Sequence, residues 1–198
     1  MTDETRPYRM KRRAESQGET RRRITESAVE LHGTVGPSRT SISAVAARAG
    51  VRRSTVYRHF PDEATLFDAC SAHWRAANPP PDLGAWAAIE DPDRRLRVAL
   101  GELYAFYGRT ERMLENLFRD EATMPVLRER FANFHRYLAA AHGTLMAGRP
   151  ADRRMQAALG HAVAFSTWRS LVREQELDAA EAAALASGLA DAAARAAT

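Results

Sequence analysis

Apolar side chains between residues 40 and 60 recur at helical spacing, and one glycine interrupts the pattern. Positions 42, 45, 46 and 49 form one apolar helix face, Gly50 follows them, and a second short helix buries Val56 and Phe60. A tight turn between two helices requires a residue with positive φ, which glycine adopts without strain. Residues 41–60 are therefore predicted to form a helix-turn-helix.

The second helix of this motif carries one polar face. By helical spacing it exposes Arg53, Ser54, Tyr57 and Arg58. Guanidinium, hydroxyl and phenol groups donate hydrogen bonds to phosphates and base edges. The pattern therefore indicates a helix that contacts nucleic acid.

Helical spacing extends over the rest of the chain, and no alternating strand pattern or hairpin signal accompanies it, so we expect an all-α fold. Capping residues mark the predicted helix starts: Ser16 with Glu19, Thr40 or Ser41, Asp62, Asp91 followed by Pro92, and Asp178 with Glu181. The later helices are predicted over 91–107, 110–120, 127–148, 155–172 and from 178 onward. No internal repeat is present.

Proline and charge divide the chain into domains. The run Asn78-Pro79-Pro80-Pro81 cannot be helical, so it ends a compact N-terminal part. The predicted organisation is a flexible basic arm over 1–15, a helix-turn-helix domain over 16–77, a linker over 78–90 and a helical domain over 91–198.

Composition narrows the class of protein. With 198 residues, 45% of them hydrophobic, the chain can fill a substantial core. Cys70 is the single cysteine, predicted to be a small buried residue, and neither a secretory signal nor a membrane span is evident, so a cytoplasmic protein without a membrane partner is expected. Residues 1–60 carry 13 basic and 6 acidic side chains, whereas 61–198 carry 16 and 19. This asymmetry favours encounter with a polyanion, although a solvated basic N-terminus would give the same count.

The segments TSISAVAARAGVRRSTVYRHF and PDEATLF resemble the TetR family of bacterial transcriptional regulators. The likeness covers roughly residues 18–75 and includes Gly50, Val51, Thr55, Tyr57, Phe60 and Leu66 together. The resemblance implies that three N-terminal helices bind DNA, that the fourth helix links to a second domain, and that this larger helical domain dimerises and holds a small effector. Residues 91–198 resemble the family in architecture alone.

The resemblance also implies which residues contact the operator. Arg53 is the first candidate for reading a base, because a guanidinium matches the O6 and N7 atoms of guanine, whereas Tyr57 and His59 suit phosphate. Arg52 stands where the family commonly has a serine cap, and it is expected to meet a phosphate instead. Glu63 stands where the family often has a lysine that touches the DNA backbone. The predicted DNA-binding residues are Thr40, Ser43, Arg52, Arg53, Ser54, Thr55, Tyr57, Arg58 and His59.

The second domain is rich in aromatic residues, which either form its core or line a pocket for an apolar ligand. The predicted pocket residues are Tyr104, Tyr107, Met113, Leu117, Phe131, Phe134, His135, Phe165, Trp168 and Arg169. By resemblance, a ligand that binds only one conformer would shift the spacing of two recognition helices and release the operator.

A homodimer through the last two helices is expected on a pseudo-palindromic operator, because one recognition helix reads too few base pairs to be selective. The predicted interface residues are Ala157, Leu159, Val163, Ala164, Ala182, Leu185, Ala186, Gly188 and Leu189. Alanine-rich helices also occur on solvated faces, where alanine simply favours the helix.

No catalytic constellation is evident, so the chain is not predicted to be an enzyme. The six histidines lack metal-ligand spacing, no glycine-rich phosphate loop occurs, and Cys70 has no activating partner in sequence. We expect no cofactor and no metal. The predicted function is a ligand-responsive repressor; the alternatives are a DNA-binding regulator without an effector and an activator.

Overall fold

A computed structural model describes residues 5–195, without the side chains of 5–9, 11, 13 and 194–195. Every regular element in this range is helical, as the sequence predicts. The chain divides into two compact units, one made of Met1–Asn78 with Arg112–Arg130 and the other of Pro79–Glu111 with Phe131–Thr198. The segment 112–130 therefore packs with the N-terminal helices, although the sequence pattern assigns it to the second domain.

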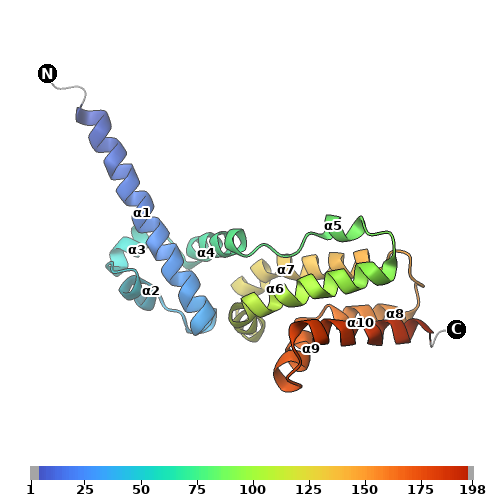
Figure 1. Ribbon diagram of the computed structural model, residues 1–198. Helices are drawn as coiled ribbons and strands as arrows, with labels where there is room; N and C mark the ends of the chain where they lie inside the picture. The colour runs from blue at the N-terminus through green and yellow to red at the C-terminus, as the bar shows by residue number, and fades with distance from the viewer. Residues whose placement is uncertain (1–4, 196–198) are drawn as a thin grey trace. The chain divides into compact units, whose positions relative to one another are not determined.

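The first unit is built around a helix-turn-helix (Figure 1). Helix α1 packs against α2 and α4, and α2 packs against α3. Its elements are α1 (Thr5–Thr34), a 3₁₀ turn (Pro37–Arg39), α2 (Ile42–Arg48), α3 (Arg53–His59) and α4 (Glu63–Ala77), with the ends of α6 and α7. The core of this unit consists of apolar side chains from the first four helices, among them Ile24, Ala28, Val45, Val56, Phe60 and Leu66.

Helix α1 begins earlier than the sequence predicts. Residues 5–15, expected as a non-helical arm, belong to this helix, and residues 1–4 of the expected arm lie outside the described residues. Ser16 is inside the helix, where its carbonyl accepts from the Thr20 hydroxyl, so it does not cap a helix with Glu19. Val35, predicted on the buried stripe, is 39% exposed because the helix ends one residue before it.

Short-range caps form where they are predicted. The Ser41 hydroxyl accepts from the Ala44 N–H at the start of α2, and the Asp62 carboxylate accepts from the Thr65 N–H at the start of α4. Cys70 on α4 is buried, and burial raises the pKa of its thiol to about 12. This cysteine is therefore a protonated core residue.

The second unit is a helical bundle with α8 packed on α10. Its elements are α5 (Leu83–Ala87), α6 (Pro92–Asp120), α7 (Pro125–Met146), α8 (Arg153–Ala162), α9 (Phe165–Arg169), a π-turn (Ser170–Glu174) and α10 (Ala179–Arg195). Residues 112–120 of α6 and 125–130 of α7 belong to the first unit instead. The capping box at the start of α10 forms as predicted. The Asp178 N–H donates to the Glu181 carboxylate, and the Glu181 N–H donates to the Asp178 carboxylate.

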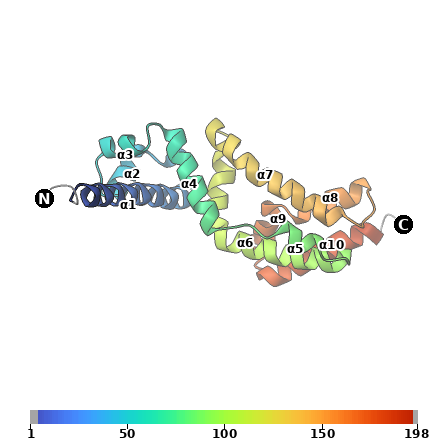
Figure 2. The same ribbon diagram turned by 90° about the horizontal axis from the view of Figure 1, so that it is seen from above.

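The predicted 78–90 linker contains a short helix, α5, which lies over α6 in Figure 2. Its buried Trp86 donates from Nε1 to Glu102 at 2.7 Å. Two predictions about helix extents in this part of the chain are wrong. The expected break between 107 and 110 is absent, because α6 runs unbroken for 29 residues. The helix predicted over 155–172 is instead interrupted at Val163 and Ala164, between α8 and α9.

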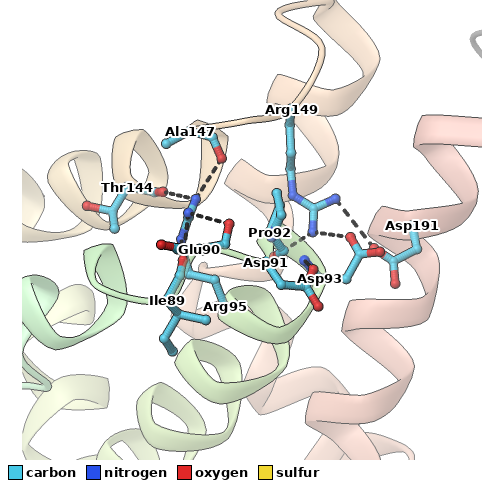
Figure 3. A network of polar contacts seen from close by, with 10 residues as sticks. All are labelled: Ile89, Glu90, Asp91, Pro92, Asp93, Arg95, Thr144, Ala147, Arg149 and Asp191. Atoms are coloured by element: carbon cyan, nitrogen blue, oxygen red, sulfur yellow. Dashed lines mark hydrogen bonds and ion pairs between the residues drawn. The ribbon is translucent and has the colours of Figure 1, made fainter.

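Two arginines fix the N-terminal end of α6 (Figure 3). Arg95 is 6% exposed and donates to main-chain carbonyls on both sides of it: Ile89, Glu90, Thr144 and Ala147. The last two carbonyls lie at the end of α7, where unpaired helix carbonyls carry partial negative charge. Arg149, from the connection between α7 and α8, donates to the Pro92 carbonyl and pairs with Asp93 and Asp191. The buried guanidinium of Arg95 therefore joins the start of α6 to the end of α7.

We predict that Arg95→Ala lowers the free energy of unfolding by about 3 kcal/mol, because it leaves several buried carbonyls without a donor. Urea denaturation followed by circular dichroism measures this. The matched control is Arg94→Ala, since Arg94 is the exposed neighbour on the same helix, and it should change stability by less than about 0.5 kcal/mol. Equal effects of the two variants would contradict a structural role for the Arg95 network.

Candidate nucleic-acid interface

Buried apolar side chains fix α2 and α3 of the helix-turn-helix in the core of the first unit. Val45 and Ala46 of α2 and Val56 of α3 are at most 3% exposed and pack together with Phe60, which ends α3. Gly50 in the turn has φ +65°, as the sequence predicts for this position. Because the apolar side of α3 is fixed in the core, its other side must face outward.

The predicted contact residues of this motif differ in their exposure to solvent. Arg52, Arg53, Ser54, Tyr57 and Arg58 are exposed, as is Ser43 on α2; Thr55, His59 and Thr40 are half-buried. The exposed residues of α3 are therefore Arg53, Ser54, Tyr57 and Arg58, and Arg52 directly before the helix is exposed as well. The Arg52 side chain makes no capping hydrogen bond, as expected from its lack of an acceptor.

Two of the half-buried residues are less available for DNA than predicted. The Thr40 hydroxyl donates to the Gly36 carbonyl at 2.8 Å, so this donor is engaged within the protein. The Nε2 atom of His59 is buried, so a phosphate contact would need its other ring nitrogen. Burial, and then the charges of Arg58 and Arg21, hold the pKa of His59 below its usual value, so the ring is neutral at neutral pH.

Arg21 on α1 is a positioning residue that the sequence reasoning missed. Its guanidinium lies over the Phe60 ring, 4.0 Å from the centroid, and donates to the His59 carbonyl. These contacts hold the C-terminal end of α3. A signal was present in the pattern, because Arg21 lies three residues before the buried Ile24 on the same face of α1.

The last turns of α6 form hydrogen bonds with the end of α1 and with the loop that leads from α1 into α2. Asp120 is 3% exposed, and its carboxylate accepts from the Ser38 N–H at 3.0 Å and from the Arg119 guanidinium. Arg119 also donates to the Val35 carbonyl, while the Asn116 amide donates to the His32 carbonyl. Burial alone would raise the pKa of Asp120, but the hydrogen bonds from Arg119 and Ser38 outweigh it, so the pKa is lowered and the carboxylate stays charged.

Gly36 is the point where this loop approaches α6 most closely. It has φ +97° and ψ 156°, a region that only glycine adopts readily. A Cβ at this position would lie 2.6 Å from the Asp120 carboxylate and would overlap the Arg119 guanidinium. The missing side chain therefore makes room for the ion pair.

The predicted pocket residues fall into two groups. Met113 and Leu117 belong to the first unit, and the other eight belong to the second. Within the second unit, ring contacts connect most of these eight through Phe106: Tyr104, Tyr107, Phe131, Phe134, His135, Phe165 and Trp168. Arg169 is exposed and lies 3.7 Å from Glu174.

Several predicted interface residues are buried inside a single chain. Leu159, Val163, Ala182 and Ala186 are at most 4% exposed, because α8 and α10 pack on each other through them. Beyond its first two residues, Ala179 and Ala180, which are also exposed, the exposed residues of α10 form one strip at helical spacing, namely Glu181, Ala184, Leu185, Gly188, Leu189 and Ala192. Leu185 and Leu189 are 43% and 58% exposed. Ala157 is exposed and Ala164 is half-buried.

Comparison with known proteins agrees with this geometry. Residues 24–70 match the family model of bacterial regulatory proteins of the TetR family. The helix-turn-helix region of this chain is thus similar to the TetR family. The match spans the helix-turn-helix and the first half of α4.

Solved structures extend the likeness in fold over both units of this chain. A TetR-like transcriptional regulator from a Rhodococcus species has a TM-score of 0.63 and 21% identity, covering 86% of this chain and 93% of that one. A TetR-family regulator from Streptomyces coelicolor gives 0.57 and 19%, covering 89% and 79%. The multidrug binding protein EbrR complexed with imidazole gives 0.53 and 25%, covering 85% and 93%. No curated protein sequence matched the chain.

The comparisons show the fold predicted from the sequence, an N-terminal helix-turn-helix domain followed by a helical domain. Among residues 5–195, no helix is both long and apolar enough to cross a bilayer. In the same part of the chain, no group of three histidine, cysteine or acidic side chains is placed to hold a metal ion.

We predict that Gly36→Ala lowers the free energy of unfolding by about 2 kcal/mol, because it strains the backbone and displaces the buried Asp120 carboxylate. Gly101→Ala is the matched control, since Gly101 is an exposed glycine within α6 with open space around it. This second change should raise stability by about 0.5 to 1 kcal/mol, through helix propensity. Thermal unfolding of both variants tests the close approach, which two changes of the same sign would contradict.

Proposed function

We propose that this protein is a transcriptional regulator that binds a pseudo-palindromic DNA operator as a homodimer and is released by a small molecule. The observation that carries the proposal is the exposed face of α3, where Arg53, Ser54, Tyr57 and Arg58 are fixed outward by a buried apolar side. Arginine reads guanine edges and the other groups hold phosphates, so this face can combine sequence readout with anchoring.

The dimer is proposed through α10, supported by its exposed strip. Leu185 and Leu189 lie one turn apart with Gly188 between them, so the strip offers apolar area and permits close helix approach. Two copies related by a twofold axis would present two recognition helices to successive major grooves, about 34 to 36 Å apart.

A small-molecule effector is proposed for the second unit. EbrR, which has this fold, is a multidrug binding protein, and the aromatic cluster of the present chain is the kind of lining that holds apolar ligands. Helix α6 supplies a physical link, because it carries Tyr104 and Tyr107 in one unit and Arg119 and Asp120 in the other. A ligand that favours one position of α6 would therefore bias the loop before α2.

A regulator that lacks an effector, or one that activates transcription, would use the same DNA-binding face. A cytoplasmic location also stays a prediction. Selection of bound sequences from random duplex DNA identifies the operator, and this site is the substrate for the tests below.

We predict that Arg53→Ala weakens operator binding by about 1 to 3 kcal/mol and relaxes the preference at one base pair. Tyr57→Phe should weaken binding to all sequences alike, because it removes a hydroxyl that suits phosphate. Fluorescence anisotropy at fixed ionic strength, on operator and on scrambled duplex, separates the two effects. Arg94→Ala serves as the control for loss of positive charge, and operator binding unchanged in both test variants would remove α3 from the interface.

We predict that the parent protein sediments as a dimer at micromolar concentration and that Leu189→Glu shifts it toward the monomer, because a carboxylate would be buried without a partner. Ala180→Glu is the matched control: Ala180 is exposed on the opposite side of α10, so a charge there should leave the dimer intact. A monomeric parent protein, or a Leu189→Glu dimer of unchanged stability, would exclude this interface.

A further inference from the structure

Trp168 in the second unit has a hydrogen-bond donor without an acceptor. Its side chain is 1% exposed, and no described residue accepts from the indole Nε1–H. Buried polar groups in folded proteins are almost always paired, since leaving one unpaired costs the hydration that it had in the unfolded chain. Trp86 illustrates the usual arrangement, because its Nε1–H donates to Glu102.

The polar groups around Trp168 are already engaged with one another. The Tyr104 and Tyr107 hydroxyls donate to the carbonyls of Ala162 and Val163, at 3.0 and 2.6 Å. These two carbonyls end helix α8, where helix geometry leaves them without partners of their own. The Thr167 hydroxyl lies 2.6 Å from the His161 carbonyl, to which it donates. The Nε1–H of Trp168 is thus a donor that this arrangement has left over.

Aromatic rings surround the same indole. Its ring stacks on Phe165 with centroids 5.3 Å apart, and the Tyr107 ring lies 5.9 Å away. The Tyr107 and Phe165 rings meet edge to face at 5.3 Å. Gly108 on α6 lies beside the edge of the indole that carries Nε1, where a Cβ would be 3.8 Å from Cζ2. Flat apolar faces and one unused donor therefore occur together.

The backbone after Trp168 is irregular. Helix α9 has five residues and passes directly into the π-turn Ser170–Glu174. Glu176 then has φ +58°, a left-handed conformation that is uncommon outside glycine. A π-turn and a left-handed residue close together are features that often accompany ligand sites, and they offer a segment that can rearrange with little loss of regular hydrogen bonding.

We propose that the Trp168 Nε1–H is the hydrogen-bond donor to the effector, and that the effector is an uncharged, planar heteroaromatic compound with an acceptor atom in its ring. This inference rests on the proposed function, because it assigns a ligand to the second unit. The ligand inserts beside the indole as the segment from Ala164 to Leu177 shifts, and its acceptor completes the hydrogen bond that the chain leaves unmade.

The surrounding chemistry selects this class of ligand. A planar ring continues the stacking of Phe165 and Trp168 and the edge contacts of Tyr107. Arg173 lies 5.9 Å from the indole ring and is already paired with Glu111. A charged ligand would lose its hydration without gaining a counter-ion, so an uncharged one is favoured. An acceptor is required because the unused group is a donor.

Quinoline and naphthalene form a matched pair of probes, since they share one shape and only quinoline has a ring nitrogen that accepts a hydrogen bond. We expect the parent protein at neutral pH to bind quinoline about threefold to tenfold more tightly than naphthalene in equilibrium dialysis. Trp168→Phe keeps an aromatic ring and removes the donor, so the ratio of the two dissociation constants should fall to about one. Trp74→Phe makes the same change on α4 in the first unit, and it should leave the ratio unchanged.

A second measurement uses the parent protein and does not depend on the folding of Trp168→Phe. The chain has three tryptophans, so the indole N–H resonance of Trp168 can be assigned by elimination with Trp74→Phe and Trp86→Phe spectra. Quinoline should move this resonance downfield, and naphthalene should not. Equal affinities of the parent for both probes, absence of binding by both, or an unmoved resonance would overturn the proposal.

Operator binding separates the role of the Trp168 donor from the proposed regulation by an effector. Operator binding is measured with and without each probe, in the parent protein. An operator bound by the parent and insensitive to a quinoline that shows the Trp168 signature would refute the effector mechanism while supporting the donor. Equal binding of quinoline and naphthalene by the parent protein, with intact operator binding, would refute the donor alone.

Discussion

The buried carboxylate of Asp120 makes the polar interactions on which the first unit depends most directly. A charge taken out of water must recover its hydration energy from nearby donors, and here the donors are the Arg119 guanidinium and the Ser38 backbone N–H. Both the main-chain donor at Ser38 and the carbonyl at Val35 belong to the loop that leads into α2. The position of the helix-turn-helix relative to α6 within this unit is therefore set by ionic hydrogen bonds as well as by apolar packing.

Helix α6 is unbroken and contributes residues to both units, so the helix that carries Asp120 also continues into the second unit. Its N-terminal end is fixed by the buried Arg95, its middle contributes Tyr104 and Tyr107 to the aromatic cluster, and its C-terminal end carries Asp120. An α-helix of 29 residues is stiff because each backbone bond constrains its neighbours. One helix thus carries buried polar side chains at its start, in its middle and at its end, namely Arg95, Tyr104, Tyr107 and Asp120.

Features set by a few neighbouring residues could be predicted from the sequence. The caps at Ser41, Asp62 and Asp178 formed as expected, and Gly50 has the positive φ that its turn requires. Predictions about accessibility were less successful. Thr40 and His59 are polar residues of the motif, yet one donates within the loop and the other buries a ring nitrogen. Arg21 was missed because its partners on α3 lie 38 residues or more further along the chain.

The sequence by itself determined the helical class, the helix-turn-helix and its exposed basic face, because these follow from periodicity and capping over short distances. Only the tertiary structure decided that residues 112–130 pack with the N-terminal helices, that α6 is unbroken, and that Ala182 and Ala186 face α8. The physical reason is that a pattern of apolar residues specifies that a face is covered, whereas the partner that covers it depends on contacts between residues far apart in the chain.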